Sequence, residues 1–133
     1  MCKLFIQADA KLWRSSTRSI RIDGVVTSIR LEAFFWMTLE EIADRDNLSV
    51  AQLITRLYLE AIDAEHDLGN FTSFLRVCCS RYLSLVADGR LQRDVHAPLS
   101  EIDAGQVLEV EAKDSAKRFG VIALRRQSSD TVN

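Results

Sequence analysis

Three cysteines and two histidines are the side chains of this sequence that could ligate a metal: Cys2, Cys78, Cys79, His66 and His96. Structural zinc sites place their ligands in close pairs, such as Cys-x-x-Cys and His-x-x-x-His. The sequence contains neither spacing, and Cys78 falls on the apolar side of an expected helix. Three cysteines cannot pair off, and adjacent cysteines rarely form a disulfide. We therefore expect reduced thiols and no metal site.

Motifs that position nucleophiles or phosphate groups are also missing. The sequence has no Gly-x-Ser-x-Gly, no P-loop and no Gly-x-Gly-x-x-Gly, and its five glycines leave little room for one. The neighbouring carboxylates Glu40 and Glu41 are more typical of a solvated helix face than of an acid–base pair. The sequence thus predicts a protein that is not an enzyme, with no catalytic residue and no cofactor.

The net charge of −2 is unevenly distributed. Residues 1–31 hold six basic and two acidic side chains, whereas residues 32–86 hold four basic and nine acidic ones. A basic N-terminal segment beside an acidic body suggests an anionic partner for that segment. The alternative is that the arginines only keep an exposed hairpin soluble, and charge alone leaves both interpretations open.

The size and composition of the chain are those of one ordinary globular domain. It has 133 residues, of which 47% are hydrophobic and 27% charged. No apolar run approaches the roughly 18–20 residues that cross a membrane. The first residues, 1–6, are too few for a signal-peptide core. We therefore expect a cytoplasmic protein without a membrane partner.

A short alternating strand lies near the N-terminus, and the rest of the pattern is organised around it. Within 25–31, Ile29 and Leu31 occupy one face. The other face carries Val26, Ser28 and Arg30. The strand follows Asp23-Gly24, and Asp-Gly between two alternating segments is a strong hairpin signal because both residues tolerate a positive φ. We expect 18–22 to pair with 25–31. A further strand is expected at 3–8.

Three amphipathic helices are expected after this strand. The first spans about 32–45, the second begins behind the N-cap residue Ser49, and the third spans about 72–86. The third helix has an ordinary apolar stripe, which favours packing over the first two helices. The chain then divides into a domain over 1–86 and a C-terminal extension over 87–133.

The extension has a weaker pattern than the domain. The runs 107–110 and 120–124 favour two short strands, although helix is not excluded. The polar residues 127–133 are expected to be disordered. The sequence leaves the role of this extension open.

The order of strand, helix, serine-capped turn and helix resembles a ribbon-helix-helix DNA-binding protein. The matching motifs are Thr27-Ser28-Ile29-Arg30-Leu31-Glu32, Phe35-Trp36, Leu39-Glu40-Glu41-Ile42-Ala43, Asn47-Leu48-Ser49 and Leu53-Ile54-Thr55-Arg56-Leu57. Thr17-Arg18-Ser19, the Asp-Gly turn and Gly69-Asn70-Phe71 resemble one bacterial subfamily of these proteins. The resemblance covers about residues 1–86. It implies an α+β, mainly α fold with an added N-terminal hairpin and a third helix.

The resemblance also implies an intertwined homodimer, whose strands form an intermolecular antiparallel sheet that enters the DNA major groove. The residues expected to form the dimer core are Ile29, Leu31, Phe35, Trp36, Leu39, Ile42, Leu53, Ile54 and Leu57. Those expected to read base edges are Val26, Ser28 and Arg30, with Arg30 suited to guanine O6 and N7. Those expected to hold phosphates are Ser49, Val50 and Ala51 at the start of the second helix, together with Arg18 and Arg21.

Two features depart from the family pattern. Val26 is apolar where a polar or basic reader is usual, although it could contact a thymine methyl group. The hairpin widens a dimeric sheet to four strands, and at about 4.8 Å per strand this exceeds a major groove roughly 12 Å wide. The outer strands could bend away, Arg18 and Arg21 could reach flanking phosphates, or the sheet could meet another partner.

The implied function is sequence-dependent DNA binding, as a transcriptional repressor or autoregulator. The partners would be double-stranded DNA and a second copy of the chain, with higher-order assembly on DNA left open. The alternative is a non-enzymatic interaction module, an antitoxin-like or adaptor dimer that does not read DNA. In either case the third helix or the tail could bind a protein partner.

Overall fold

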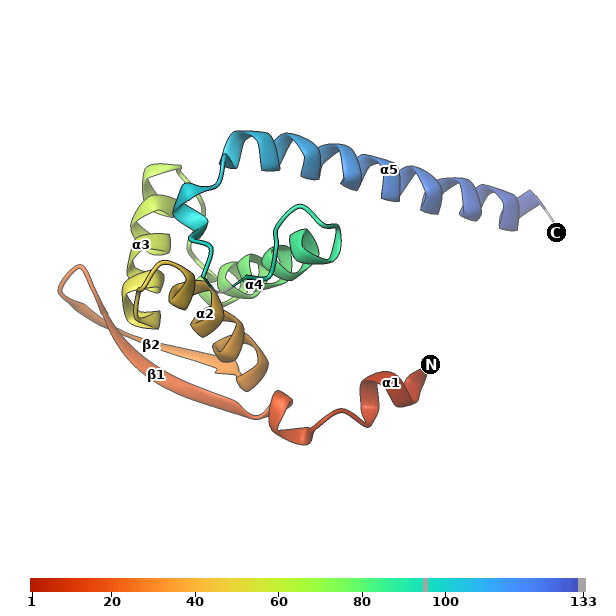
Figure 1. The fold of residues 1–133 in the computed structure, drawn as a ribbon. Coiled ribbons are helices and arrows are strands. Elements are labelled where there is room, and N and C mark those ends of the chain that lie inside the picture. Colours follow the sequence, from red (N-terminus) through yellow and green to blue (C-terminus); the bar gives the residue numbers. More distant parts are fainter. Residues whose placement is uncertain (95, 132–133) are drawn as a thin grey trace.

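The computed structural model describes residues 1–94 and 96–131. In chain order the elements are α1 (Cys2–Ile6), η1 (Ala10–Trp13), β1 (Ser15–Ile22), β2 (Val25–Glu32), α2 (Ala33–Arg45), α3 (Val50–Asp63), α4 (Phe71–Ala87), η2 (Leu99–Glu101) and α5 (Ala104–Thr131). Figure 1 shows α2, α3 and α4 gathered on one side of the β1–β2 hairpin, while α1 and the far end of α5 project away from this centre.

Strands β1 and β2 pair antiparallel in a two-stranded sheet, from Ser15 opposite Glu32 to Ile22 opposite Val25. The connecting residues Asp23 and Gly24 both have positive φ, 50° and 80°. A tight turn whose twist matches the strands requires this conformation at both positions, and Asp-Gly adopts it at little cost. The hairpin that this dipeptide predicted is confirmed, and its first strand begins earlier than expected.

The inner face of the hairpin forms one side of the hydrophobic core. It contributes four buried residues: Ile20, Ile22, Ile29 and Leu31. The helices contribute the other buried members of the cluster: Trp36, Leu39, Ala43, Leu53, Ile54, Leu75 and Cys79. Because Leu75 and Cys79 belong to α4, this helix is part of the core. The predicted packing of the third helix over the first two is confirmed.

The residues expected at a dimer core lie inside one chain. Six of the nine are buried there: Ile29, Leu31, Trp36, Leu39, Leu53 and Ile54. The other three are partly buried against the same cluster: Phe35, Ile42 and Leu57. β1 pairs with one edge of β2, and α2 and α4 contact β2, so Ile29 and Leu31 are buried within one chain.

The segment 3–8, predicted to be a strand, instead begins with the helical turn α1, and this prediction is wrong. A strand needs a neighbouring strand for its hydrogen bonds, and the hairpin ladder reaches only to Ser15. The short apolar run satisfies its backbone locally instead, with the Gln7 N–H donating to the carbonyl of Lys3 at 3.1 Å.

The two strands predicted at 107–110 and 120–124 are also wrong, because both runs lie within α5, a single helix of 28 residues. Short apolar runs do not distinguish strand from helix, and the residues between them include good helix formers such as Ala, Lys and Arg. Of the segment 127–133, predicted to be disordered, residues 127–131 continue α5, and 132–133 lie outside the described residues.

Arginine–carboxylate pairs connect the outer elements to the core. Arg76 of α4 donates to both carboxylate oxygens of Glu32, at 3.0 and 3.1 Å, and this guanidinium lowers the pKa of Glu32. Arg93 donates to Glu41, and with the Tyr82 hydroxyl it lowers the pKa of that carboxyl. The end of β2, α2, α4 and the segment after α4 are thereby held together.

The contact between α4 and α5 is of a different kind. Among the described residues, three ion pairs join α4 and the residues just after it to α5: Arg81–Glu111, Arg90–Asp114 and Arg118–Asp88. An open groove of about 560 Å³ runs between the two helices. Within the residues whose exposure is described, α5 has no fully buried side chain. None of the described helices is long and apolar enough to cross a membrane.

Candidate nucleic-acid interface

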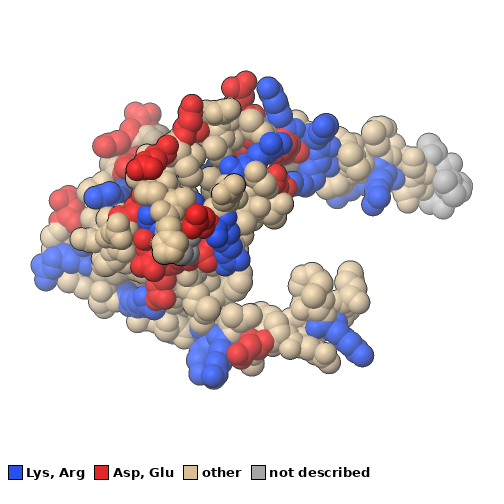
Figure 2. Space-filling model, in the orientation of Figure 1, with Lys and Arg blue, Asp and Glu red and all other residues tan. Residues whose placement is uncertain are grey.

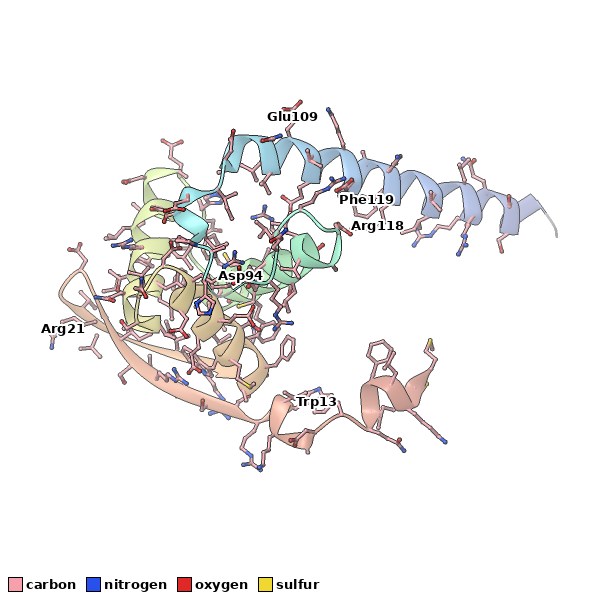
Figure 3. All side chains as sticks on the ribbon, viewed as in Figure 1. Trp13, Arg21, Asp94, Glu109, Arg118 and Phe119 are labelled. Carbon is pink, nitrogen blue, oxygen red and sulfur yellow. The ribbon has the colours of Figure 1, made fainter. Side chains whose placement is uncertain are left out.

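The outer face of the hairpin carries a row of exposed, mostly polar side chains. Because residues alternate between the faces of a strand, the buried inner-face residues fix which side chains lie outside. Three cross-strand pairs occupy the outer face: Thr17 with Arg30, Ser19 with Ser28, and Arg21 with Val26. All six side chains are exposed. Figure 3 shows Arg21 near the turn, pointing away from the helices.

This face offers more hydrogen-bonding groups than the sequence-based prediction included. Val26, Ser28 and Arg30 were expected to read bases, and the register brings Arg21 beside them. Thr17 and Ser19, which were not expected at the site, join the same row. Hydroxyl groups can donate or accept, and guanidinium groups donate in a fork that matches guanine. The signal that could have identified Thr17 and Ser19 was the alternation of β1, extended backwards from Ile20 and Ile22.

Arg18 lies on the opposite face of the hairpin from Arg21 and Arg30. It stands opposite Ile29 in the ladder, on the side that faces α2. Its Nη2 donates to Glu40 at 3.1 Å, and its guanidinium carbon is 4.4 Å from the centroid of the Trp36 ring. These contacts stabilise the attachment of the hairpin to α2. Arg18 is therefore not brought together with the other predicted site residues.

Trp36 is the second anchor of the hairpin. Its ring is buried, and its Nε1–H donates to the carbonyl of Ser16 at 3.1 Å. A buried indole N–H needs such an acceptor, since leaving it unsatisfied is costly. The hairpin is therefore held by apolar burial, by this hydrogen bond and by Arg18. These contacts fix the hairpin against α2 and leave its outer face exposed.

The start of α3 is the other element expected at a DNA interface. Ser49 is the N-cap: its hydroxyl accepts from the Gln52 N–H at 3.1 Å, and the Gln52 side chain accepts from the Ser49 N–H at 2.9 Å. This capping box satisfies two amides and leaves those of Val50 and Ala51 directed out of the helix start. Two outward amides at the positive end of a helix dipole suit an anionic group.

The side chains give little support for a metal site or a nucleophilic cysteine. Burial raises the pKa of the Cys79 thiol to about 12 and also raises that of Cys78, which is the direction opposite to that of an activated nucleophilic thiol. In the part of the chain that the structure describes, no group of three or more His, Cys, Asp or Glu side chains is placed to hold a metal ion.

Comparison with known proteins identifies the family. The family model described as "Ribbon-helix-helix domain" matches residues 15–83, which is just over half of the chain. The match runs from β1 into α4. The chain therefore belongs to the ribbon-helix-helix domain family, whose members are generally non-enzymatic DNA-binding transcription regulators.

One solved structure is similar over most of its length. It is an uncharacterized protein from Bordetella pertussis Tohama I, with 50% sequence identity and a TM-score of 0.78. The similarity covers 81% of this chain and 86% of the other. No curated protein matched. The predicted family and fold, including the N-terminal hairpin and the added helix, are confirmed.

Proposed function

We propose that this chain binds double-stranded DNA as a homodimer and acts as a transcriptional repressor or autoregulator. The observation that carries the proposal is the outer face of the hairpin. Five of its six exposed side chains, all but Val26, can form hydrogen bonds. Family membership supports the same function, since DNA binding is typical of ribbon-helix-helix proteins.

The proposed dimer forms through the unpaired edge of β2. Within the described residues the hairpin is a two-stranded sheet, so each strand keeps one edge without a ladder partner. Such an edge is a template for pairing with another chain. Antiparallel pairing of β2 with its copy gives a four-stranded sheet, with the two β2 strands in the centre and the β1 strands outside. The exposed parts of Phe35, Ile42 and Leu57 would then contribute to the interface.

In this dimer the two central strands face the groove. Arg30 donates to guanine O6 and N7, Ser28 contacts either base type, and Val26 touches a thymine methyl group. Arg21 lies on the flanking strand, where a phosphate contact positions the protein without reading sequence. Figure 1 shows that the hairpin curves along its length. This curvature supports an arrangement in which the outer strands follow the groove edges.

The start of α3 supplies the proposed phosphate clamp. The outward amides of Val50 and Ala51 would donate to one phosphate on each side of the ribbon, behind the cap formed by Ser49. Thr17 and Ser19, on the outer face of β1, would donate further hydrogen bonds to the sugar-phosphate backbone of the DNA. These contacts fix the register of the dimer on the duplex, whereas β2 selects the bases.

Fluorescence anisotropy can test this proposal with DNA from upstream of the protein's own gene and a scrambled duplex of the same composition. Arg30→Ala should reduce discrimination between the two duplexes by about 10–100-fold, the value of one bidentate base contact. Arg125→Ala removes the same charge from the projecting part of α5 and should leave discrimination unchanged. Equal binding to both duplexes, unaffected by Arg30→Ala, would refute base reading.

The second candidate is an interaction module that does not read DNA. It is favoured by Val26 in a reader position and by the width of a four-stranded sheet. DNA binding predicts a steep loss of affinity as salt rises, in proportion to the phosphates neutralised. A confirmed dimer that fails to bind either duplex at low salt, and instead co-purifies with a protein, would favour this candidate.

A further inference from the structure

The turn between α2 and α3 determines where the proposed phosphate clamp points. Asp46, Asn47 and Leu48 are the three residues between the end of α2 and the N-cap Ser49. Asn47 has a positive φ of 55°, and the Leu48 N–H donates to the carbonyl of Ala43 at 2.9 Å. Because the turn is short and closed by this hydrogen bond, a movement of the end of α2 also moves the first amides of α3.

A segment distant in the sequence holds the residues just before this turn. Segment 97–100 follows α4 and runs into η2. Arg45 Nε donates to the carbonyl of Ala97 at 2.9 Å. Asp46 Oδ1 accepts from both the backbone N–H and the hydroxyl of Ser100, at 3.1 and 2.7 Å. Figure 1 shows the chain passing α2 on its way from α4 to α5. Two successive residues at the end of α2 are therefore attached to this segment.

Arg45 fixes one end of segment 97–100 because its charge is buried. The residue is 3% exposed. Its Nη1 donates to the Tyr82 hydroxyl at 3.4 Å, and that hydroxyl donates to Glu41. A buried guanidinium that loses a hydrogen-bond acceptor is strongly destabilised. The contact between Arg45 and the Ala97 carbonyl is therefore costly to break.

Pro98 limits the movement of the segment between its two points of attachment. It lies between Ala97 and Ser100, with φ −62° and ψ 136°. The pyrrolidine ring fixes φ near this value, so the distance between the two attachments varies little. Arg93 donates to Glu41 of α2 shortly before the segment, at 3.0 Å. The connection is thus held to α2 at three positions.

The charges of this region are compensated locally. Figure 2 shows acidic and basic side chains intermixed over the part of the body that contains α2. A carboxylate near the start of a helix can itself interact with the first amides and so compete with an anionic ligand. Asp46 is such a carboxylate, three residues before the N-cap Ser49. The two hydrogen bonds from Ser100 keep it engaged elsewhere.

We infer that segment 97–100 positions the DNA interface: by holding the end of α2 it fixes the turn before α3 and so directs the amides of Val50 and Ala51 towards a DNA phosphate. Ser100 and Pro98 are then positioning residues that do not touch DNA themselves. The inference rests on the proposed function, because it assigns a role in the phosphate clamp. The competing interpretation is that the segment only stabilises the fold.

A double-mutant cycle in the full-length protein separates these interpretations. Ser100→Ala removes one donor to Asp46. Val50→Pro removes one amide of the clamp at the first helical position, where proline is tolerated. The preceding residue, Ser49, already has the extended conformation that proline requires before it, with φ −74° and ψ 159°. The clamp can therefore be weakened without breaking α3.

Fluorescence anisotropy on the upstream duplex measures the coupling. Ser100→Ala alone should weaken binding about 3–10-fold, a change on the scale of one hydrogen bond. In the Val50→Pro background the same substitution should weaken binding by less than about 2-fold, because the amide that it misplaces is already absent. Equal weakening in both backgrounds would overturn the inference, since a general loss of stability does not depend on the clamp.

Three further variants test the residues of the segment. Ser100→Thr keeps the hydroxyl and should bind as wild type does. Pro98→Gly loosens the segment without removing a hydrogen bond and should weaken binding as Ser100→Ala does. Ser80→Ala is the matched control, because Ser80 is an exposed serine of α4 outside the segment, and it should change nothing. Circular dichroism will verify that each variant folds. Wild-type affinity in both Ser100→Ala and Pro98→Gly would overturn the inference.

Amide shifts give a second readout that does not require Val50→Pro to fold. In ¹⁵N-labelled Ser100→Ala at saturating DNA, the shifts of Val50 and Ala51 should be smaller than in wild type, while those of residues 26–30 persist. Unchanged shifts at Val50 and Ala51 would contradict the inference. Failure of the wild type to bind either duplex would refute the proposed function and the clamp together, whereas wild-type binding without the coupling would refute this inference alone.

Discussion

The hairpin with its three helices and the long helix α5 are stabilised in opposite ways. Residues 15–87 surround a cluster in which Trp36, Leu39 and Ile54 are almost completely buried. α5 is instead fastened by ion pairs beside an open groove. Apolar burial stabilises cooperatively, whereas exposed ion pairs contribute about 0–1 kcal/mol each and weaken with salt. The first region is thus suited to hold a binding surface in a fixed position. The second, α5, is suited to move or to bind another surface.

The largest difference should appear on truncating aromatic side chains. Trp36→Ala removes a buried ring and the hydrogen bond to Ser16, and it should lower the free energy of unfolding by about 3–5 kcal/mol. Phe119→Ala on α5 should change it by less than about 0.5 kcal/mol, because the ring is exposed. Urea denaturation of both variants is the measurement. Similar losses would show that α5 is part of the core.

Removal of the helix caps of α3 and α5 should have smaller effects on stability, and the two effects should differ. Ser49→Ala removes the cap of α3 and should lower the global stability by about 1 kcal/mol. Asp103 accepts from the Gln106 N–H at the start of α5 in a similar way, at 3.1 Å. Asp103→Ala should leave global stability unchanged and accelerate amide exchange only in α5. If Asp103→Ala lowered the global stability as much as Ser49→Ala, α5 would be as strongly coupled to the core as α3 is.

The pair between Glu32 and Arg76 makes the core sensitive to acid. Because the pKa of Glu32 is lowered in the folded protein, its stabilisation is complete above the usual value near 4.5 and is lost as pH falls through the lowered pKa. Wild type should therefore be more stable than Glu32→Gln at about pH 7, and the difference should shrink in acid. Urea midpoints across this range test it, with Glu60→Gln, an exposed acid of α3, as control. A pH-independent difference would rule out the ionic mechanism.

The smallest expected effect is that of salt on amide exchange in α5. Raising ionic strength should increase amide exchange along α5, since it screens Arg90–Asp114 and Arg118–Asp88. Exchange in β1 and β2 should remain unchanged. Hydrogen-exchange mass spectrometry at low and high salt compares the two regions in one sample. Faster exchange in the hairpin would show that its support is also ionic.

The difference between the core and α5 also explains which elements the sequence could predict. The hairpin and the core follow from patterns that physics makes specific: Asp23-Gly24 for the turn, period two for β2, and Ser49 for the start of α3. The apolar residues of 107–110 and 120–124 lack such a pattern, because α5 has no face that the core must bury. Their short apolar runs favoured strands without excluding a helix.

The candidate site was predictable in part. Arg21, Val26, Ser28 and Arg30 share one face, as alternation and the turn imply. Arg18 is different. Alternation places it on the same face as Ile20 and Ile22, and its contacts with Glu40 and Trp36 arise only in the folded chain. The residues expected at a dimer core include Ile29 and Leu31, which are buried beside α2 and α4 within one chain. The dimer itself stays a prediction.

The most direct test of DNA recognition by the hairpin is an NMR titration of the ¹⁵N-labelled protein with the upstream duplex. We predict that amide shifts concentrate at residues 17–21 and 26–30 and at Val50 and Ala51, while those of the distal part of α5 remain unchanged. Arg30→Ala should reduce the shifts on β2. Binding that perturbs α4 and α5 and leaves the hairpin unperturbed would contradict DNA recognition by this face.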